Sequence, residues 1–182
     1  MKKTVLLIAV VLMVSTAAIA QEINWMTFEE AIAAQKQNPR HIMVDMYTNW
    51  CGPCKMLDKN TFQNKDVVKY VNENFYAVKF NAEGNDVVSY KGQTFSNPNY
   101  KEALKNRRNS SHQLARYFKI NAYPTIVYLD KQGEVIAPIK GYQKPQQIEF
   151  YLKMFNSGDY KKLKDQQSFN DYSKAFKPEF EM

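Results

Sequence analysis

Apolar positions along this chain recur either at helical spacing or in short unbroken runs. Thr27 and Glu30 form a capping box, and the apolar residues after them keep helical spacing until Asn38 ends the pattern. The run at 42–47 is typical of a buried strand. The predicted elements, in order, are helix 28–38, strand 42–47, helices 51–59 and 66–72, strand 75–80, a helix ending at 118, strands 124–129 and 134–139, and a helix beginning at 145.

This order predicts an α/β fold. A strand, a helix and a second strand in succession imply two parallel strands joined by a right-handed crossover. A turn at 130–133 then joins two further strands into an antiparallel hairpin. We therefore expect a central mixed sheet with helices on both faces and an N-terminal helix before it.

Two segments depart from the alternation. Residues 83–110 are polar and long for a connection within a compact domain, so they form an insertion that is either functional or mobile. Ser110 or Ser111 is expected to cap the helix that follows. Residues 157–182 form a basic C-terminal extension with aromatic residues and a weak helical pattern.

The insertion is expected to emerge at the edge of the sheet where Cys51 lies. It follows strand 75–80, which should run parallel to strand 42–47, and parallel strands end on one edge. Aromatic and arginine side chains dominate protein contacts. We predict that the insertion helps to select a protein partner, and the alternative is a surface excursion without one. Its relevant residues are Tyr90, Lys91, Phe95, Tyr100, Lys101, Arg107 and Arg108.

The first twenty residues have the order of a secretory signal peptide. Two lysines come first, an apolar run spans residues 5–14, and Ala18 and Ala20 supply a small-residue cleavage site. The run is short for a segment that crosses about 30 Å of hydrocarbon. We expect residues 1–20 to be removed and the protein to be exported to the periplasm. If they were retained, they would tether it to the membrane.

Composition is that of a single globular domain. The 182 residues are 45% hydrophobic and 24% charged, which allows a real core. The formal charge of +7 falls to about +5 without Lys2 and Lys3, the charged residues of the first twenty. Because the lysines are scattered and an exported protein meets little nucleic acid, we expect no nucleic-acid partner, and a monomer.

Cys51 and Cys54 are the two cysteines of the chain, and their spacing points to chemistry. A structural disulfide stabilises most when it closes a long loop, and this pair encloses two residues, Gly52 and Pro53. Half of a zinc site is the alternative, but four ligands are usual and the chain has two histidines. We expect neither metal nor cofactor.

The same spacing suits thiol–disulfide exchange. The thiolate is the nucleophile, and a helix N-terminus stabilises its charge. Cys51 would lie at such a terminus as the exposed attacking thiol. Cys54, shielded one turn further on, would then attack the mixed disulfide and release the substrate. Pro53 loses no hydrogen bond in a first helical turn.

The segment Trp50-Cys51-Gly52-Pro53-Cys54-Lys55 resembles the active site of the thioredoxin family. The resemblance covers roughly residues 41–155 and extends, in the family's order, to Asp45, Lys79, Tyr123-Pro124-Thr125, Gly133 and Gly141. It implies a thioredoxin fold over residues 21–156, with the insertion before a cis-proline loop, and a redox-active Cys51–Cys54 disulfide.

The resemblance also implies roles for Asp45 and Lys79. Asp45 would be a buried acid of raised pKa that relays the proton of Cys54, and Lys79 would face it. The alternatives are a solvated acid at a strand end and a lysine that faces solvent.

Substrate contacts are implied for a second group of residues. Pro124 would follow a cis bond that lets the Tyr123 backbone pair with an incoming peptide. Trp50, Gly52 and Pro53 would complete that surface, although Trp50 could belong to the core. Tyr47 and Tyr123 depart from the family's usual tryptophan and small aliphatic residue, so specificity stays open.

The Gly-Pro spacer is typical of reducing members of the family. We therefore expect a reductase of disulfides in exported proteins or apocytochromes that takes electrons from a membrane donor. The alternatives are a disulfide oxidase or isomerase, and a partner-binding module, which would need no cysteines.

Overall fold

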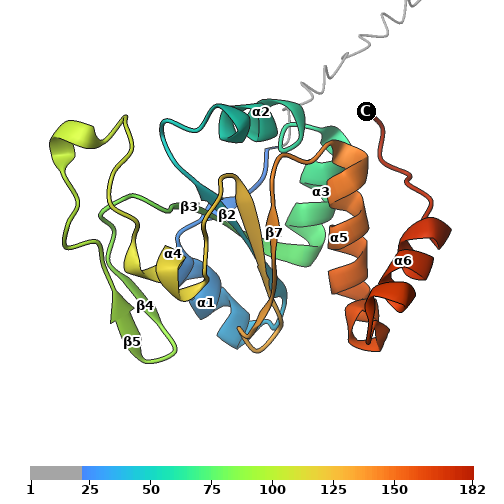
Figure 1. Cartoon of the computed structure of the whole chain (residues 1–182). Helices are drawn as coiled ribbons and strands as arrows, with labels where there is room; N and C mark the ends of the chain where they lie inside the picture. The colour runs from blue at the N-terminus through green and yellow to red at the C-terminus, as the bar shows by residue number, and fades with distance from the viewer. Residues whose placement is uncertain (1–21) are drawn as a thin grey trace, which may run out of the picture.

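The computed structural model describes residues 22–182, so the predicted signal peptide lies outside the described residues. A five-stranded sheet in the order β1-β3-β2-β6-β7 forms its centre (Figure 1). The first three strands in this order are parallel, and β6 and β7 are antiparallel to their neighbours. The mixed sheet confirms the predicted class. Its strands are β1 Trp25–Met26, β2 His41–Tyr47, β3 Phe75–Asn81, β6 Thr125–Leu129 and β7 Val135–Lys140.

Helices cover both faces of this sheet. On one face the core is built with α1 and α4, and on the other with α3 and α5 (Figure 1). Helix α2 follows β2 and runs along the edge where the parallel strands end. The helices are α1 Phe28–Gln37, α2 Gly52–Asn60, α3 Lys65–Asn74, α4 Gln113–Tyr117, α5 Pro145–Ser157 and α6 Gln166–Ala175.

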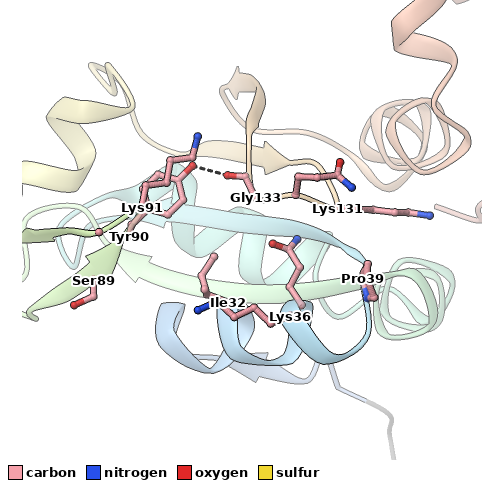
Figure 2. Close-up of a pocket in the computed structure, with 11 residues that line it drawn as sticks. Ile32, Lys36, Pro39, Ser89, Tyr90, Lys91, Lys131 and Gly133 are labelled. Carbon is pink, nitrogen blue, oxygen red and sulfur yellow. Dashed lines mark hydrogen bonds between the residues drawn. The ribbon is translucent and has the colours of Figure 1, made fainter.

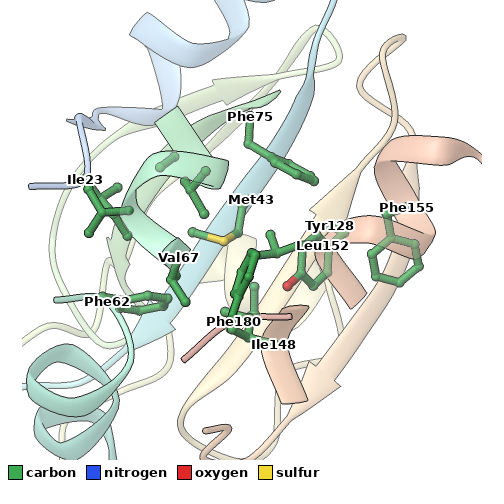
Figure 3. Packing of buried hydrophobic residues seen from close by; sticks show 14 of the residues in the cluster. Ile23, Met43, Phe62, Val67, Phe75, Tyr128, Ile148, Leu152, Phe155 and Phe180 are labelled. Atoms are coloured by element: carbon green, nitrogen blue, oxygen red, sulfur yellow. The ribbon is translucent and has the colours of Figure 1, made fainter. Parts of the chain in front are cut away.

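Strand β2 shows why the apolar run at 42–47 is unbroken. Side chains alternate between the two faces of a strand, and both faces are covered here. Met43 packs with α3 and α5, whereas Ile42 and Val44 pack with α1 and α4. Figure 3 shows Met43 among the aromatic and aliphatic side chains of the α3–α5 layer. Asp45 has the same parity as Met43 and therefore belongs to the face that α2, α3 and α5 cover.

Helix starts follow the sequence with one exception. Thr27 and Glu30 form the predicted capping box, with the Thr27 amide 2.8 Å from Glu30 Oε2. Helix α4 is capped by His112, whose Nδ1 accepts from the Leu114 amide at 3.0 Å, so the prediction of Ser110 or Ser111 is wrong. Both serines precede the capping position, and the Ser110 hydroxyl instead donates to Asn97 Oδ1 at 2.7 Å.

The insertion folds into a hairpin followed by a loop with one 3-10 turn. Its strands are β4 Val88–Tyr90 and β5 Gln93–Phe95, and the 3-10 turn η1 spans Glu102–Leu104. Tyr90 and Phe95 are 3% and 7% exposed and belong to the α1–α4 core layer. The expectation that these two aromatics would serve a partner is therefore wrong, because packing against α1 and α4 uses their surface.

The C-terminal extension turns back over α5. After the short turn η2 Asp159–Lys162, α6 places Phe169 and Tyr172 beside Phe150 of α5. The last residues then reach α3, and Phe180 is buried in the α3–α5 layer (Figure 3). The extension is thus part of the folded core.

A candidate redox site at the start of helix α2

Cys51 and Cys54 are joined by a disulfide at the N-terminus of α2. Cys51 is the residue that caps the helix, and its Sγ lies 3.1 Å from the Cys54 amide, which donates to it. Pro53 occupies the first turn, where its missing amide hydrogen would have had no helical partner. The Cys54 amide and the helix N-terminus at Cys51 Sγ provide the environment that stabilises a thiolate.

The two cysteines are almost equally buried in this disulfide state. Cys51 is 2% exposed and Cys54 is 3% exposed, so the predicted order of an exposed first and a shielded second cysteine is not observed. In this state Cys51 Sγ is bonded to Cys54 and accepts from the Cys54 amide, so both contacts tie it to the first turn of α2. The flanking Gly52 and Pro53 are exposed, and access to the sulfurs is therefore along this face.

Asp45 is a buried acid on the same side of the sheet as α2. It is 1% exposed, and its Oδ1 has no hydrogen-bond partner within the described residues. Burial is the main cause that raises its pKa to about 7, opposed by the Lys79 charge and reinforced by the Asp58 charge. The expectation of a buried carboxyl with a near-neutral pKa is confirmed.

Lys79 pairs with Asp45, as the resemblance implied. In the sheet register Asp45 lies opposite Lys79, and Lys79 Nζ is 3.4 Å from Asp45 Oδ2. The same ammonium group forms an ion pair with Asp58 of α2. It also lies 4.8, 5.4 and 5.7 Å from the ring centres of Trp25, Tyr47 and Phe62, which hold it by cation–π contacts.

A cleft of about 370 Å³ opens beside Cys54. Asp58 and Lys55 of α2 form one side of it, and Asn106 of the insertion reaches it from the other. Because Asp58 lines this cleft and pairs with Lys79, it connects the buried Asp45–Lys79 pair with the surroundings of Cys54. The remaining lining residues are Tyr47, Thr48 and Asn49.

A larger hollow of about 530 Å³ lies away from the cysteines, between α1, the β4–β5 hairpin and the turn after β6 (Figure 2). Figure 2 shows Tyr90 across from Lys131 and Lys36, with its hydroxyl donating to the Gly133 carbonyl at 2.6 Å. No cysteine lines this hollow. Of these two, the smaller cleft is therefore the one that lies next to the redox-active disulfide.

Trp50 and Tyr123 form an aromatic pair next to the disulfide. Their ring centres are 6.0 Å apart in an edge-on arrangement, and both side chains are half-buried. The Tyr123–Pro124 peptide bond is cis, as the resemblance implied. Because Trp50 is half-buried, one part of its side chain packs against the fold and the other part is available to the substrate surface.

Sequence reasoning missed two carboxylates that organise this site. Asp58 lies four residues after Cys54, the spacing that brings residues onto one helical face, and this signal could have identified it. Glu83 accepts hydrogen bonds from Trp50 Nε1 at 2.7 Å and from the Asn109 amide at 2.8 Å. No local pattern could have paired Glu83 with Trp50, because 33 residues separate them.

Comparison with known proteins places this arrangement in a family. The family described as a thioredoxin-like domain matches residues 28–156. The thiol:disulfide interchange protein DsbD of Pectobacterium atrosepticum is 22% identical over 126 residues, which are 68% of this chain and 18% of that protein. The thiol-disulfide oxidoreductase ResA of Bacillus thuringiensis is 23% identical over 112 residues, 62% of this chain and 61% of that protein.

Among solved structures, a thioredoxin-fold protein from Helicobacter pylori superposes with a TM-score of 0.56 at 23% identity, covering 76% of this chain and 82% of that one. This likeness shows a shared fold. The chain spans less than a fifth of the length of the DsbD relatives that it matches. Within residues 22–182, no helix combines the length and the apolar character needed to cross a membrane.

Proposed function

Since the chain belongs to the thioredoxin-like domain family, we propose that it is a thiol–disulfide oxidoreductase that acts outside the cytoplasm as a monomeric reductase of disulfides in exported proteins or apocytochromes. Cys51 and Cys54 carry the reaction. The observation that supports this most directly is the Cys51–Cys54 pair at the start of α2, with the buried Asp45 on the side of the sheet that α2 covers.

The reaction begins from the dithiol form. The Cys51 thiolate attacks one sulfur of a substrate disulfide, so a Cys51–substrate disulfide forms and the other substrate sulfur leaves as a thiolate. Cys54 then loses its proton and attacks Cys51 Sγ, which expels the second substrate thiolate. Two enzyme thiols are thereby oxidised to the disulfide, and the substrate gains two electrons.

Asp45 acts in the second step as the acceptor of the Cys54 proton. A base works best when its pKa lies near the working pH, and the pKa of Asp45 is raised to about 7. Lys79 keeps the carboxylate of Asp45 paired in the charged state, and Asp58 holds Lys79 in place. Trp50, Gly52, Pro53 and Tyr123 form the surface that receives the substrate chain, and the buried Pro124 supports it through the cis bond that follows Tyr123.

Two further features support the direction and place of the reaction. The spacer Gly52-Pro53 adds no charged side chain that would stabilise the Cys51 thiolate further. A couple whose reduced form is only modestly stabilised is a reducing one. The lysines and apolar run of residues 1–20 support export. A dithiol donor in the membrane would return the enzyme to its reduced form.

The roles of the two cysteines can be tested by trapping. Cys54→Ser should accumulate a covalent mixed disulfide with a protein substrate, because nothing is left to resolve it, whereas Cys51→Ser should form none and lose all reduction of insulin. Non-reducing electrophoresis and intact mass separate these species. Trapping by Cys51→Ser and not by Cys54→Ser would reverse the assignment.

A further inference from the structure

One stretch of the insertion forms a basic surface next to the disulfide. Among residues 84–110, five are basic and two, Asp86 and Glu102, are acidic. Lys91 pairs with Glu134 at the far end of the hairpin. The other four basic residues lie between residues 101 and 108 and are exposed, and we call them the basic wall: Lys101, Lys105, Arg107 and Arg108.

The basic wall is attached directly to the residues that flank Cys51. Asn49 donates from Nδ2 to the Lys105 carbonyl at 2.8 Å. The guanidinium of Arg108 lies 5.0 Å above the ring centre of Trp50. Asn106, between these two, lines the cleft that also contains Cys54. A chain that presents its disulfide to Cys51 therefore passes beside the wall.

Buried hydrogen bonds hold the wall in this position. Glu83 is 8% exposed, and one of its carboxylate oxygens accepts from both Trp50 Nε1 and the Asn109 amide. Asn109 closes the loop on itself by exchanging two hydrogen bonds with the backbone of Lys101, at 2.8 and 3.1 Å. Asn97, 6% exposed, donates to the carbonyls of Gly84 and Ser110 and ties the base of the loop together.

The acidic side chains near this surface are paired or buried, except Asp86, which is exposed and forms no ion pair within residues 22–182. Glu102 is compensated by Lys105 at 3.0 Å, and Asp58 in the cleft is compensated by Lys79. Glu83 is buried beneath the wall. Lys55, exposed in the first turns of α2, adds a further positive charge across the cleft from Asn106. The rim of the redox site on the insertion side is thus positively charged.

We propose that the basic wall docks acidic residues that flank the disulfide of a protein substrate, and so decides which disulfides Cys51 reaches. This inference rests on the proposed reductase function and names the chemistry of its substrates. Charges at the rim of a contact act mainly through the rate of association and its dependence on salt. The wall should therefore change how fast an acidic substrate reacts while leaving the exchange chemistry itself unchanged.

The test uses two peptides with the same internal disulfide, one flanked by glutamates and the other by lysines, together with a small uncharged disulfide. The second-order rate constant for reduction by the full-length, pre-reduced protein is measured at low and at high salt. We expect the acidic peptide to react about tenfold faster than the basic one at low salt, with the preference falling towards unity at high salt.

A variant with reversed charges in the basic wall tests whether the wall causes this preference. Lys101 and Arg107 form no ion pair within residues 22–182, so Lys101→Glu with Arg107→Glu should not disturb the loop. This variant should lose the preference for the acidic peptide and keep the wild-type rate with the uncharged disulfide. The matched control, Lys36→Glu with Lys131→Glu at the remote hollow, makes the same change in net charge and should keep the preference.

Each result decides one of the two proposals. If the wild-type protein reduces the uncharged disulfide but shows no preference between the peptides, the docking proposal is overturned and the reductase function stands. If both charge-reversed variants lose the preference equally, net charge and not the wall is responsible, and the proposal is again overturned. Failure of the wild-type protein to reduce any of the three would contradict the proposed function itself.

Discussion

Asp45 is the residue whose surroundings bear most directly on the chemistry. Its carboxyl is shut away from water between β2 and α2, and the single ammonium of Lys79 is shared between it and Asp58. Partial compensation of this kind leaves the pKa near 7. A fully paired acid would be permanently ionised and unable to hold a proton during the exchange.

The raised pKa of Asp45 makes stability depend on pH. Its value is 3.8 in the unfolded chain and about 7 in the fold, so its contribution is fully present below about pH 4 and is lost as the pH rises through 7. Asp45→Asn should therefore match the wild type near pH 4 and exceed its free energy of unfolding at pH 8 by about 2–4 kcal/mol. Urea unfolding at both pH values measures this.

His41 changes the stability with pH in the opposite sense to Asp45, and it does so equally in the wild type and in the Asp45→Asn variant. Burial lowers its pKa to about 4, so its contribution is present above pH 6.5 and is lost as the pH falls towards 4. Comparing wild type and variant at each pH removes this effect.

In the same variant the rate of disulfide reduction should fall, and its pH profile between 6 and 9 should lose the step near pH 7 that Asp45 contributes. An unchanged rate profile would mean that Asp45 is not the proton acceptor.

Much of the site at this scale was predictable because the patterns are local. A two-residue spacing identified Cys51 and Cys54, and one acid inside an apolar run identified Asp45. Glu83 was not predictable, since its partners Trp50 and Asn109 are brought to it by the fold. The equal burial of the two cysteines also has no sequence signal, because it depends on how the closed disulfide is covered.

At the scale of elements, the β4–β5 hairpin shows how a readable signal can be missed. In β4, Val88 and Tyr90 are buried on either side of the exposed Ser89, the period of two expected for strands, and Phe95 is buried at the end of β5. Lys91 and Gly92 form the turn with φ of 51° and 73°, the left-handed region that glycine favours. Because the insertion as a whole is polar, the two strands to which these residues belong were not predicted from the sequence. Strand β1 had no such signal, because its two residues are defined only by pairing with β3.

The hairpin should support the fold and not the reaction. Phe95→Ala removes a buried ring from the α1–α4 layer and should lower the free energy of unfolding by about 3 kcal/mol. Thr94→Ala, on the exposed face of the same strand, should stay within about 0.5 kcal/mol of wild type. Denaturant titration gives both values. A loss of small-disulfide reduction by folded Phe95→Ala would contradict this division of roles.

At the scale of the whole molecule, a buried carboxylate helps to fasten the C-terminal extension, in addition to its aromatic packing. Glu149 of α5 is 0% exposed and accepts from the backbone amides of Glu179 and Phe180 at 2.9–3.0 Å. Lys153 lies 2.7 Å from it and supplies the opposite charge. The weak helical pattern after residue 157 predicted α6 only faintly, because its apolar side needs α5 to pack against.

Removing this attachment should loosen the extension. Glu149→Ala leaves buried amides and Lys153 without their acceptor and should cost about 3 kcal/mol of unfolding free energy. Glu179→Ala removes only an exposed partner of Lys153 and should cost less than about 1 kcal/mol. Thermal unfolding with limited proteolysis checks both. Equal effects of the two substitutions would mean that the buried carboxylate does not hold the extension.

The direction of the reaction is the central claim, and the equilibrium redox potential of the Cys51–Cys54 couple tests it most directly. The couple is equilibrated with defined glutathione mixtures, and the fraction of dithiol is read by thiol alkylation and mass. The account predicts a strongly reducing couple, about −270 mV, since the Gly52-Pro53 spacer adds no charged or hydrogen-bonding side chain that would stabilise the Cys51 thiolate further. A value of about −180 mV or higher would contradict it and identify the protein as an oxidase or isomerase.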